Sequence, residues 1–260
     1  PMTETPDAMT DCSIRVPLPA LRQALKDVLP HAEPTKVGDE VTAFQRVRLS
    51  ADKSELFVMA TSGATSALAA VPIETGSDSR AERFAAWDGP FEIDLSPSTV
   101  RRIRQVFPCR EANADGEYDV VQLDMTPDAI MISDASGLFV EILGQALRVS
   151  CLPYSSDYPN LRDALARALG AAGESQTAKP LVSTGGMFAL FNHAATAYRM
   201  PLTYEGTGPK ESRGFIVWCG PSFIGHVSSQ HNDDNSLAKR DAYRRRHMER
   251  LGLQPALELV

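Results

Sequence analysis

The sequence contains an internal repeat. The segment VRLSADKSELFVMATSG (residues 47–63) aligns without gaps with VQLDMTPDAIMISDASG (residues 121–137). Both segments begin V-x-L, continue into an apolar stretch and end in Ser-Gly, and their short alternating runs are typical of paired strands. Self-similarity on this scale predicts a duplicated supersecondary unit, because two copies of one pattern fold in the same way.

A short strand and an amphipathic helix precede each of these segments. The first copy has CSIRV (12–16) and a helix whose leucines and valine share one face. The second has FEIDL (91–95) and a helix over 97–107, with Ser96 as its cap and Pro97 at its first position. Each copy therefore reads as strand, helix and three strands. We expect the two helices to lie side by side about a local twofold, beneath one continuous sheet.

A third, incomplete copy follows. One helix over 183–198 is expected, followed by strands in MPLTYEG (200–206) and RGFIVWCGPSFIGHVSS (213–229). The intervening segment holds a helix with Leu161, Leu165 and Leu169 inward, and then a linker of small residues. The sequence predicts a two-unit domain over 11–153, a partial second domain over 154–230, and a basic helix with a C-terminal tail over 231–260.

The charge of the chain is unevenly distributed. The formal net charge is -7, yet the second helix carries Arg101, Arg102 and Arg104. The acidic balance argues against a protein that coats nucleic acid everywhere, but it allows a local basic surface. No apolar run approaches the roughly 20 residues that span a bilayer, and the polar start of the sequence is unlike a secretory signal. The four cysteines are widely separated, so we expect a reducing cytoplasm with no metal site, disulfide framework or cofactor.

A duplicated strand-helix-strands unit with cationic helices in an acidic chain resembles the bacterial DNA sliding clamp, the beta subunit of DNA polymerase III. LRQALKDVLP resembles the opening helix of a clamp and VRLSADKSELFVMATSG its hairpin. SDYPNLRDAL is similar to the segment between clamp domains, and PSFIGHVSS to the last strand of a domain. The resemblance covers roughly residues 13–229. It implies an α+β, DNA-clamp-like fold of repeated units with antiparallel sheets and an incomplete second domain. A clamp protomer has three whole domains, whereas this chain offers one complete domain and part of another.

The resemblance also implies contacts with DNA. In that family, domains close into a ring, helices line the hole, and their cations face phosphates without reading the bases. The implied DNA-binding residues of the body are Arg22, Lys26, Arg101, Arg102, Arg104, Arg162, Arg167 and Arg199. The alternative is that each of these arginines belongs to an ordinary solvated helix face. Because the second domain is incomplete, a closed homo-oligomeric ring and an open or monomeric clamp relative both remain open.

The C-terminal segment carries two further signals. A helix is predicted from Asn235 or Ser236 to about Leu251, and its Arg244, Arg245 and Arg246 suggest phosphate binding. The alternative is a solvated terminus. The last residues, QPALELV, resemble the Q-x-x-L-x-L-F motif of clamp partners. The matching residues are Gln254, Leu257, Leu259 and, in place of the usual phenylalanine, Val260. A strand or apolar anchor on the chain's own domain is the alternative.

The sequence thus predicts a processivity or clamp-accessory factor in DNA replication or repair, without catalysis of its own. Its expected partners are duplex DNA and a DNA polymerase or sliding clamp, and no membrane. One rival is a clamp-binding regulator that never encircles DNA. The other is a small hydrolase centred on Ser222 with His226, His231, Asp233 and Asp234 nearby, although GPSFIG lacks the G-x-S-x-G spacing.

Overall fold

The computed structural model describes residues 12–34, 40–52, 54–74, 91–107, 119–135, 146–170, 184–207 and 214–228, together with 238–239 and 242–243. The first copy forms β1 (Cys12–Pro17), α1 (Leu18–Val28), β2 (Val47–Ala51), β3 (Glu55–Thr61) and β4 (Thr65–Pro72), with single 3-10 turns at Leu29–His31 and Ala43–Gln45. The second forms β5 (Phe91–Leu95), α3 (Pro97–Val106), β6 (Val120–Met125), β7 (Ala129–Asp134) and β8 (Ala146–Ser150). The predicted strand-helix-strands order is confirmed in both copies.

The two copies exchange their first strands. The sheets have the orders β1-β6-β7-β8 and, at one end of the larger sheet, β5-β2-β3-β4, with antiparallel neighbours throughout. The pairings are equivalent in register, since Ile14 faces Leu123 in one sheet and Ile93 faces Leu49 in the other. An ungapped repeat predicts this result, because the hairpin register is set by its apolar alternation.

The expectation of one continuous sheet over both helices is wrong, since the two copies build two sheets. The segments after β4 and β8 connect them at equivalent places. The Glu74 N–H donates to the Arg15 carbonyl at 2.8 Å, and the Leu152 N–H donates to the Asp94 carbonyl at 2.7 Å. The chain that follows the last strand of each copy therefore runs beside the first strand of the same copy, which lies at the edge of the other sheet, and the two sheets are joined around one core.

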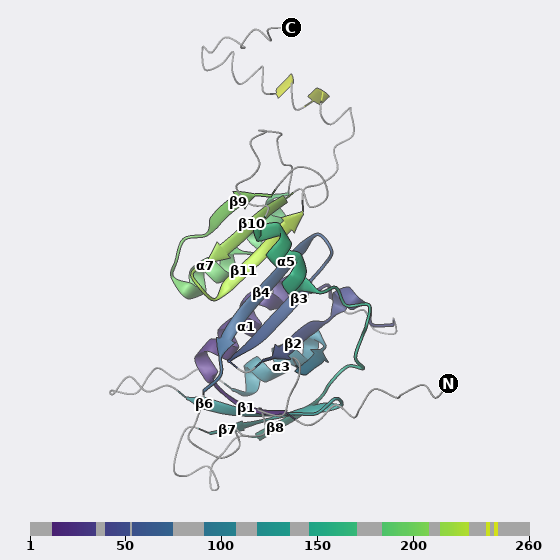
Figure 1. The fold of residues 1–260 in the computed structure, drawn as a ribbon, viewed down its shortest axis with the longest axis vertical. Coiled ribbons are helices and arrows are strands. Elements are labelled where there is room, and N and C mark those ends of the chain that lie inside the picture. The colour runs from purple at the N-terminus through teal and green to yellow at the C-terminus, as the bar shows by residue number, and fades with distance from the viewer. Residues whose placement is uncertain are drawn as a thin grey trace.

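The third unit extends the larger sheet. Its strands are β9 (Thr203–Gly206), β10 (Gly214–Cys219) and β11 (Phe223–Ser228), and β11 pairs with β4 to complete the order β5-β2-β3-β4-β11-β10-β9. The single helix expected over 183–198 is instead two, α6 (Gly185–Ala189) and α7 (Asn192–Tyr198), which break so that Phe191 enters the core. Figure 1 shows the three strands stacked beyond β4, at the far end of the molecule from β6, β7 and β8.

The larger sheet is covered on both faces. Alternate residues of β3 and β4, such as Val58 and Ala69, face the main core with α1, α3 and Phe191. The residues between them, such as Phe57 and Leu68, face a second cluster with α5 (Leu161–Gly170). The predicted inward residues Leu161 and Leu165 are buried there. Helix α5 therefore lies on the side of the sheet opposite to α1 and α3 (Figure 1). No helix in the described ranges is long and apolar enough to cross a bilayer.

Candidate nucleic-acid interface

Helices α1, α3 and α7 form one layer over the sheets, and their charge is almost entirely positive. Helix α1 contacts α3 on one side and α7 on the other. The segments 18–28, 97–106 and 192–198 contain five arginine or lysine residues and one carboxylate, Asp27, in a chain of net charge -7. The predicted pairing of segments 18–29 and 97–107 is thereby confirmed. The arrangement concentrates cations on one face of an otherwise acidic protein, which favours contact with phosphates.

Arg22 of α1 already has partners within the protein. Its guanidinium donates to the backbone carbonyls of Arg104 and Phe107, at the end of α3. The last carbonyls of a helix have no partner inside the helix and attract cations. Arg22 thus stabilises the α1–α3 packing, and we assign it this structural role in addition to its charge. Lys26, one turn later, is half-buried.

Arg101 and Arg102 are the free cations of α3. Both side chains are exposed on the described surface, whereas Arg104 is half-buried and its Nε has no hydrogen-bond partner. Burial and the nearby charge of Arg22 lower the pKa of the Arg104 guanidinium. Two exposed arginines in successive positions present charge to solvent without a competing carboxylate on their own helix. They are the residues of this layer best placed to meet a phosphate backbone.

The one acidic residue of the layer is removed from solvent. Asp27 is 0 % exposed, accepts a hydrogen bond from the Gln23 amide, and has a second carboxylate oxygen with no partner. Burial raises the pKa of Asp27 to about 6, although Lys26, His193 and Arg104 oppose the rise. With a pKa of about 6, the Asp27 carboxylate is still mostly ionised at pH 7, so the layer keeps one buried negative charge among its cations.

The structure does not bring all predicted DNA-binding arginines to this layer. Arg162 and Arg167 are exposed on α5, across the larger sheet from α1 and α3, so they do not belong to this layer, and their contact with DNA stays a prediction. Arg162 stacks over Phe57 with 4.2 Å from its Cζ to the ring centroid and lies 3.7 Å from Asp52. Arg199 is exposed at the end of α7 in a left-handed conformation. Arg244, Arg245, Arg246, Gln254, Leu257, Leu259 and Val260 lie outside the described residues.

A buried ion-pair network holds the linker after β8. Arg48 of β2 donates to both carboxylate oxygens of Asp94, at 2.8 and 3.0 Å, and to Glu92 at 3.2 Å. Its guanidinium also donates to the Ser155 carbonyl and lies between the rings of Tyr154 and Tyr158, 4.6 and 4.3 Å from their centroids. Burial disfavours the Arg48 charge, but the hydrogen bonds and charge of Asp94 outweigh it, so the pKa of Arg48 is raised.

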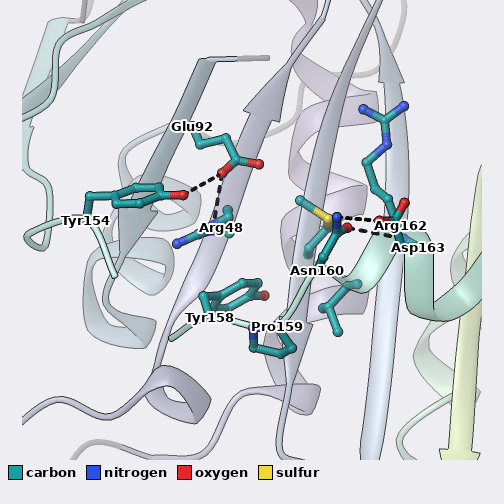
Figure 2. Close-up of a pocket in the computed structure, with 10 residues that line it drawn as sticks. Arg48, Glu92, Tyr154, Tyr158, Pro159, Asn160, Arg162 and Asp163 are labelled. Atoms are coloured by element: carbon teal, nitrogen blue, oxygen red, sulfur yellow. Dashed lines mark hydrogen bonds and ion pairs between the residues drawn. The ribbon is translucent and has the colours of Figure 1, made fainter. Parts of the chain in front are cut away.

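A cleft of about 390 Å³ opens beside this network (Figure 2). Its walls are the arginine and the two tyrosines, joined by the start of α5 and by Met59 of β3. The polar groups in view pair with one another: the Tyr154 hydroxyl donates to Glu92, and the Asn160 amide donates to Asp163 at 2.7 Å. We therefore interpret the cleft as the surface left where the linker after β8 is anchored to the sheet.

This network was not predicted from the sequence, although the two strands carry a signal for it. In VRLSA and FEIDL the apolar residues alternate with Arg48, Glu92 and Asp94. Strand alternation places all three charged residues on one face of adjacent strands. A basic and two acidic side chains on the same face are the pattern expected of a paired, buried ion cluster.

Among the described residues, Ser222 and His226 of the rival hydrolase reading do not lie together as a catalytic pair. Ser222 lies in the turn between β10 and β11, and His226 is four residues further along β11. At about 3.3 Å per strand residue, the two are on the order of 13 Å apart, too far for a serine to be activated by that histidine. His231, Asp233 and Asp234 lie outside the described residues. Within the described part of the chain, no three His, Cys, Asp or Glu side chains gather as metal ligands would.

Comparisons with known proteins identify the fold. The sequence matches no protein-family model and no curated protein. Among solved structures, the DNA polymerase sliding clamp of Bacillus subtilis matches with a TM-score of 0.54 and 10% identity, covering 89% of this chain and 67% of that one. The DNA polymerase III beta subunit of Thermotoga maritima matches with a TM-score of 0.54 and 11% identity, covering 88% and 67%. A Helicobacter pylori beta clamp bound to a DNA ligase peptide matches with 0.52 and 11%, covering 89% and 68%.

The predicted fold class is confirmed. The chain has the sliding-clamp fold, with mixed helices and antiparallel sheets, over about two thirds of a clamp chain's length. One complete two-unit body and a third unit make up the described part.

Proposed function

We propose that this protein is a DNA sliding-clamp-like processivity or accessory factor that binds duplex DNA without sequence preference through helices α1 and α3. The observation that carries the proposal is the cationic layer on a clamp fold. Arg101 and Arg102 are exposed, and the single carboxylate of the layer is buried. Phosphate contacts of this kind give affinity that does not depend on base sequence and that falls with salt.

The test uses two charge-matched double variants. Arg101→Gln/Arg102→Gln removes two cations from the helical layer, and Arg162→Gln/Arg167→Gln removes two from the opposite side of the sheet. Fluorescence anisotropy with a labelled duplex gives the dissociation constant across a salt series. For the α3 variant, we expect weaker binding at low salt and a log–log salt slope reduced by about two, since each phosphate contact contributes about 0.9. For the α5 variant, we expect an unchanged slope.

Two results would contradict the proposal. One is a wild-type protein with no affinity for duplex DNA at low salt. The other is an equal loss of affinity in both double variants, which would mean that the net charge of the protein matters and the helical layer does not. A larger loss in the α5 variant would transfer the interface to the outer helix and reject the assignment to α1 and α3.

We further propose that residues 254–260 attach the protein to a sliding clamp, which makes it an accessory of a clamp. The segment QPALELV retains the glutamine and two leucines of the partner motif, and short peptides with such anchor residues bind in surface grooves of partner proteins. A clamp is bound to a peptide in the Helicobacter pylori structure. Replacing the motif's aromatic residue by Val260 gives up buried apolar area, so weak binding is expected.

A pull-down of purified clamp by the full chain and by a chain ending at residue 253 tests this attachment. We expect recovery only with the full chain. A Leu257→Ala/Leu259→Ala variant provides the matched control, because it keeps the length of the tail. Equal recovery by all three proteins would end the proposal, whereas loss of clamp binding with retained DNA binding would separate the tail's role from that of the helices.

A further inference from the structure

Helix α3 is held at its two ends by groups of different origin. At its beginning, the Ser96 side chain accepts a hydrogen bond from the Thr99 N–H at 3.0 Å, so this end is capped by its own segment. At its end, the guanidinium of Arg22 donates to the carbonyls of Arg104 and Phe107. Because the last carbonyls of a helix have no partner inside it, Arg22 of α1 supplies the donors for this end from another helix.

The end of α1 is closed by its own chain. After α1 the chain continues into the 3-10 turn Leu29–His31, where the Ala32 N–H donates to the Leu29 carbonyl. The two copies of the repeat therefore differ in how their helices end. The helix whose end is bound by a cation from its neighbour is α3, which also carries the exposed Arg101 and Arg102.

The buried face of α3 is narrow. Its buried residues are Pro97, Val100 and Ile103, whereas α1 buries six residues. A single apolar stripe sets the distance between the helix and the sheet, but it resists rotation of the helix about its own axis less than a broad apolar face does. The hydrogen bonds from Arg22 add a directional constraint at the end of α3, because a hydrogen bond weakens steeply away from its preferred angle.

The rotation of α3 sets the direction in which Arg101 and Arg102 point. Both side chains are exposed and adjacent in the sequence. Side chains extend to about 5–6 Å from a helix axis, so a rotation of roughly 30° would move them by about 3 Å. That displacement is as long as the hydrogen bond between an arginine and a phosphate, about 2.7–2.9 Å. The orientation of α3 therefore determines whether the two guanidinium groups can meet a phosphate backbone together.

We propose that Arg22 is a positioning residue for DNA binding, which holds the rotation of α3 so that Arg101 and Arg102 face the duplex, and which does not itself contact a phosphate. This role rests on the proposed DNA binding and gives α1 and α3 separate parts in it. The Arg22 guanidinium is half-buried, is engaged with two carbonyls and lies near the like charge of Arg104. Contact with DNA would require it to leave the end of α3 and abandon these hydrogen bonds.

A double-mutant cycle tests this role. Arg22→Met keeps apolar bulk but removes the donors, and it is introduced into the wild type and into the Arg101→Gln/Arg102→Gln variant. Fluorescence anisotropy gives the affinity for a labelled duplex at a salt concentration where all four proteins bind. We expect Arg22→Met to weaken binding at least about fivefold in the wild type and less than about twofold in the double variant, because residues that act through one another are not additive.

Arg199→Met is the matched control, because Arg199 is an exposed arginine at the end of α7, in another unit of the fold. It removes the same charge and should change the affinity by the same factor in both backgrounds. If Arg22→Met also did so, with a salt slope reduced by about 0.9 in each background, Arg22 would be a phosphate ligand and the positioning role would be rejected. No loss of affinity in either background would reject it as well.

Hydrogen exchange of the full chain without DNA measures the positioning separately from the binding. In Arg22→Met, the amides in the last turn of α3 should exchange faster than in the wild type, whereas Arg199→Met should leave them unchanged. Unchanged exchange in Arg22→Met would overturn the role of Arg22 even if the wild type binds DNA. A wild type without affinity for duplex DNA would instead reject the proposed function, and this role in binding with it.

Arginine labelling of the wild type provides a measurement that needs no variant to fold. Phenylglyoxal modifies accessible guanidinium groups, and mass spectrometry of the peptides locates the modified residues. Duplex DNA should protect Arg101 and Arg102 from modification and leave the slow modification of Arg22 unchanged. Protection of Arg22 to the same extent as Arg101 would show that it contacts the phosphates, and would refute its assignment as a positioning residue.

Discussion

Replacing Arg48 by methionine should weaken the attachment of the linker between β8 and α5 to the sheet and destabilise the protein. Arg48 is 5% exposed, pairs with both oxygens of Asp94, which is 0% exposed, and donates to the Ser155 carbonyl at 2.7 Å. Methionine keeps much of the apolar volume between Tyr154 and Tyr158 but supplies no donor. The buried carboxylate would keep Arg46 at 3.3 Å and the Ser155 N–H at 3.3 Å.

The expected loss of unfolding free energy follows from the Asp94 carboxylate, which stays buried after its main partner is removed. Removing one member of a buried ion pair costs about 3–5 kcal/mol, because the other charge stays buried without its main partner. The remaining contacts of Arg46 place the estimate at the lower end, about 3 kcal/mol. For a protein of this size, that corresponds to a fall in Tm of roughly 10 °C. Guanidinium denaturation followed by tryptophan fluorescence measures it directly, with Trp218 located in the cluster that α5 covers.

Arg162→Met is the matched control. Arg162 also has a carboxylate and an aromatic ring as neighbours, Asp52 at 3.7 Å and Phe57, but 43% of its side chain is exposed. An exposed pair of this kind contributes about 0–1 kcal/mol. If Arg48→Met and Arg162→Met destabilised the protein equally, burial would not be the source of the network's strength, and our account of the linker would be wrong.

Two further predictions concern single buried positions. Asp27→Asn should stabilise the protein at pH 7.5 by up to about 3 kcal/mol and leave its stability unchanged near pH 3.5. The reason is that the Asp27 pKa is raised from 3.8 to about 6, so the wild type loses stability as the pH rises through that window. The measurement is the difference in unfolding free energy between the two proteins at each pH, which would not change with pH if the carboxylate were solvated. Gly225→Ala should cost about 1–3 kcal/mol in thermal unfolding, because an added Cβ would meet the Phe191 ring and lie 2.7 Å from the Ser66 carbonyl, whereas Gly185→Ala, where nothing lies within 4 Å, should cost little.

The local elements were predictable from the sequence because their signals are local. Ser96 does cap α3, accepting a hydrogen bond from the Thr99 N–H at 3.0 Å, and the ungapped repeat reproduces the hairpin register. The side of the sheet on which α5 lies was not predictable. Its leucines define one apolar face, but β3 and β4 are apolar on both faces, so the pattern does not choose between them.

The contacts of Arg22 could not be predicted from the sequence either. Helical spacing placed this residue away from the sheet, which the structure bears out, but spacing within one helix says nothing of a neighbouring helix. The acceptors of Arg22 are carbonyls at the end of α3, more than eighty residues later in the sequence. Such contacts depend on the packing angle and offset of two helices, which no pattern in either one contains.

The duplication explains how one layer of helices can carry both structural and exposed charge. Arg22 and Arg101 each occupy the fifth position of their helix, so the repeat places a cation at the same point twice. Because the two helices pack with the end of α3 near α1, only the first cation reaches unpaired carbonyls, and the second stays exposed. A carboxylate at the position of Arg22 would be repelled by the carbonyls at the end of α3, and one at the position of Arg101 would be repelled by phosphates. This double requirement gives a physical reason for a helical layer that remains cationic while the chain as a whole is acidic.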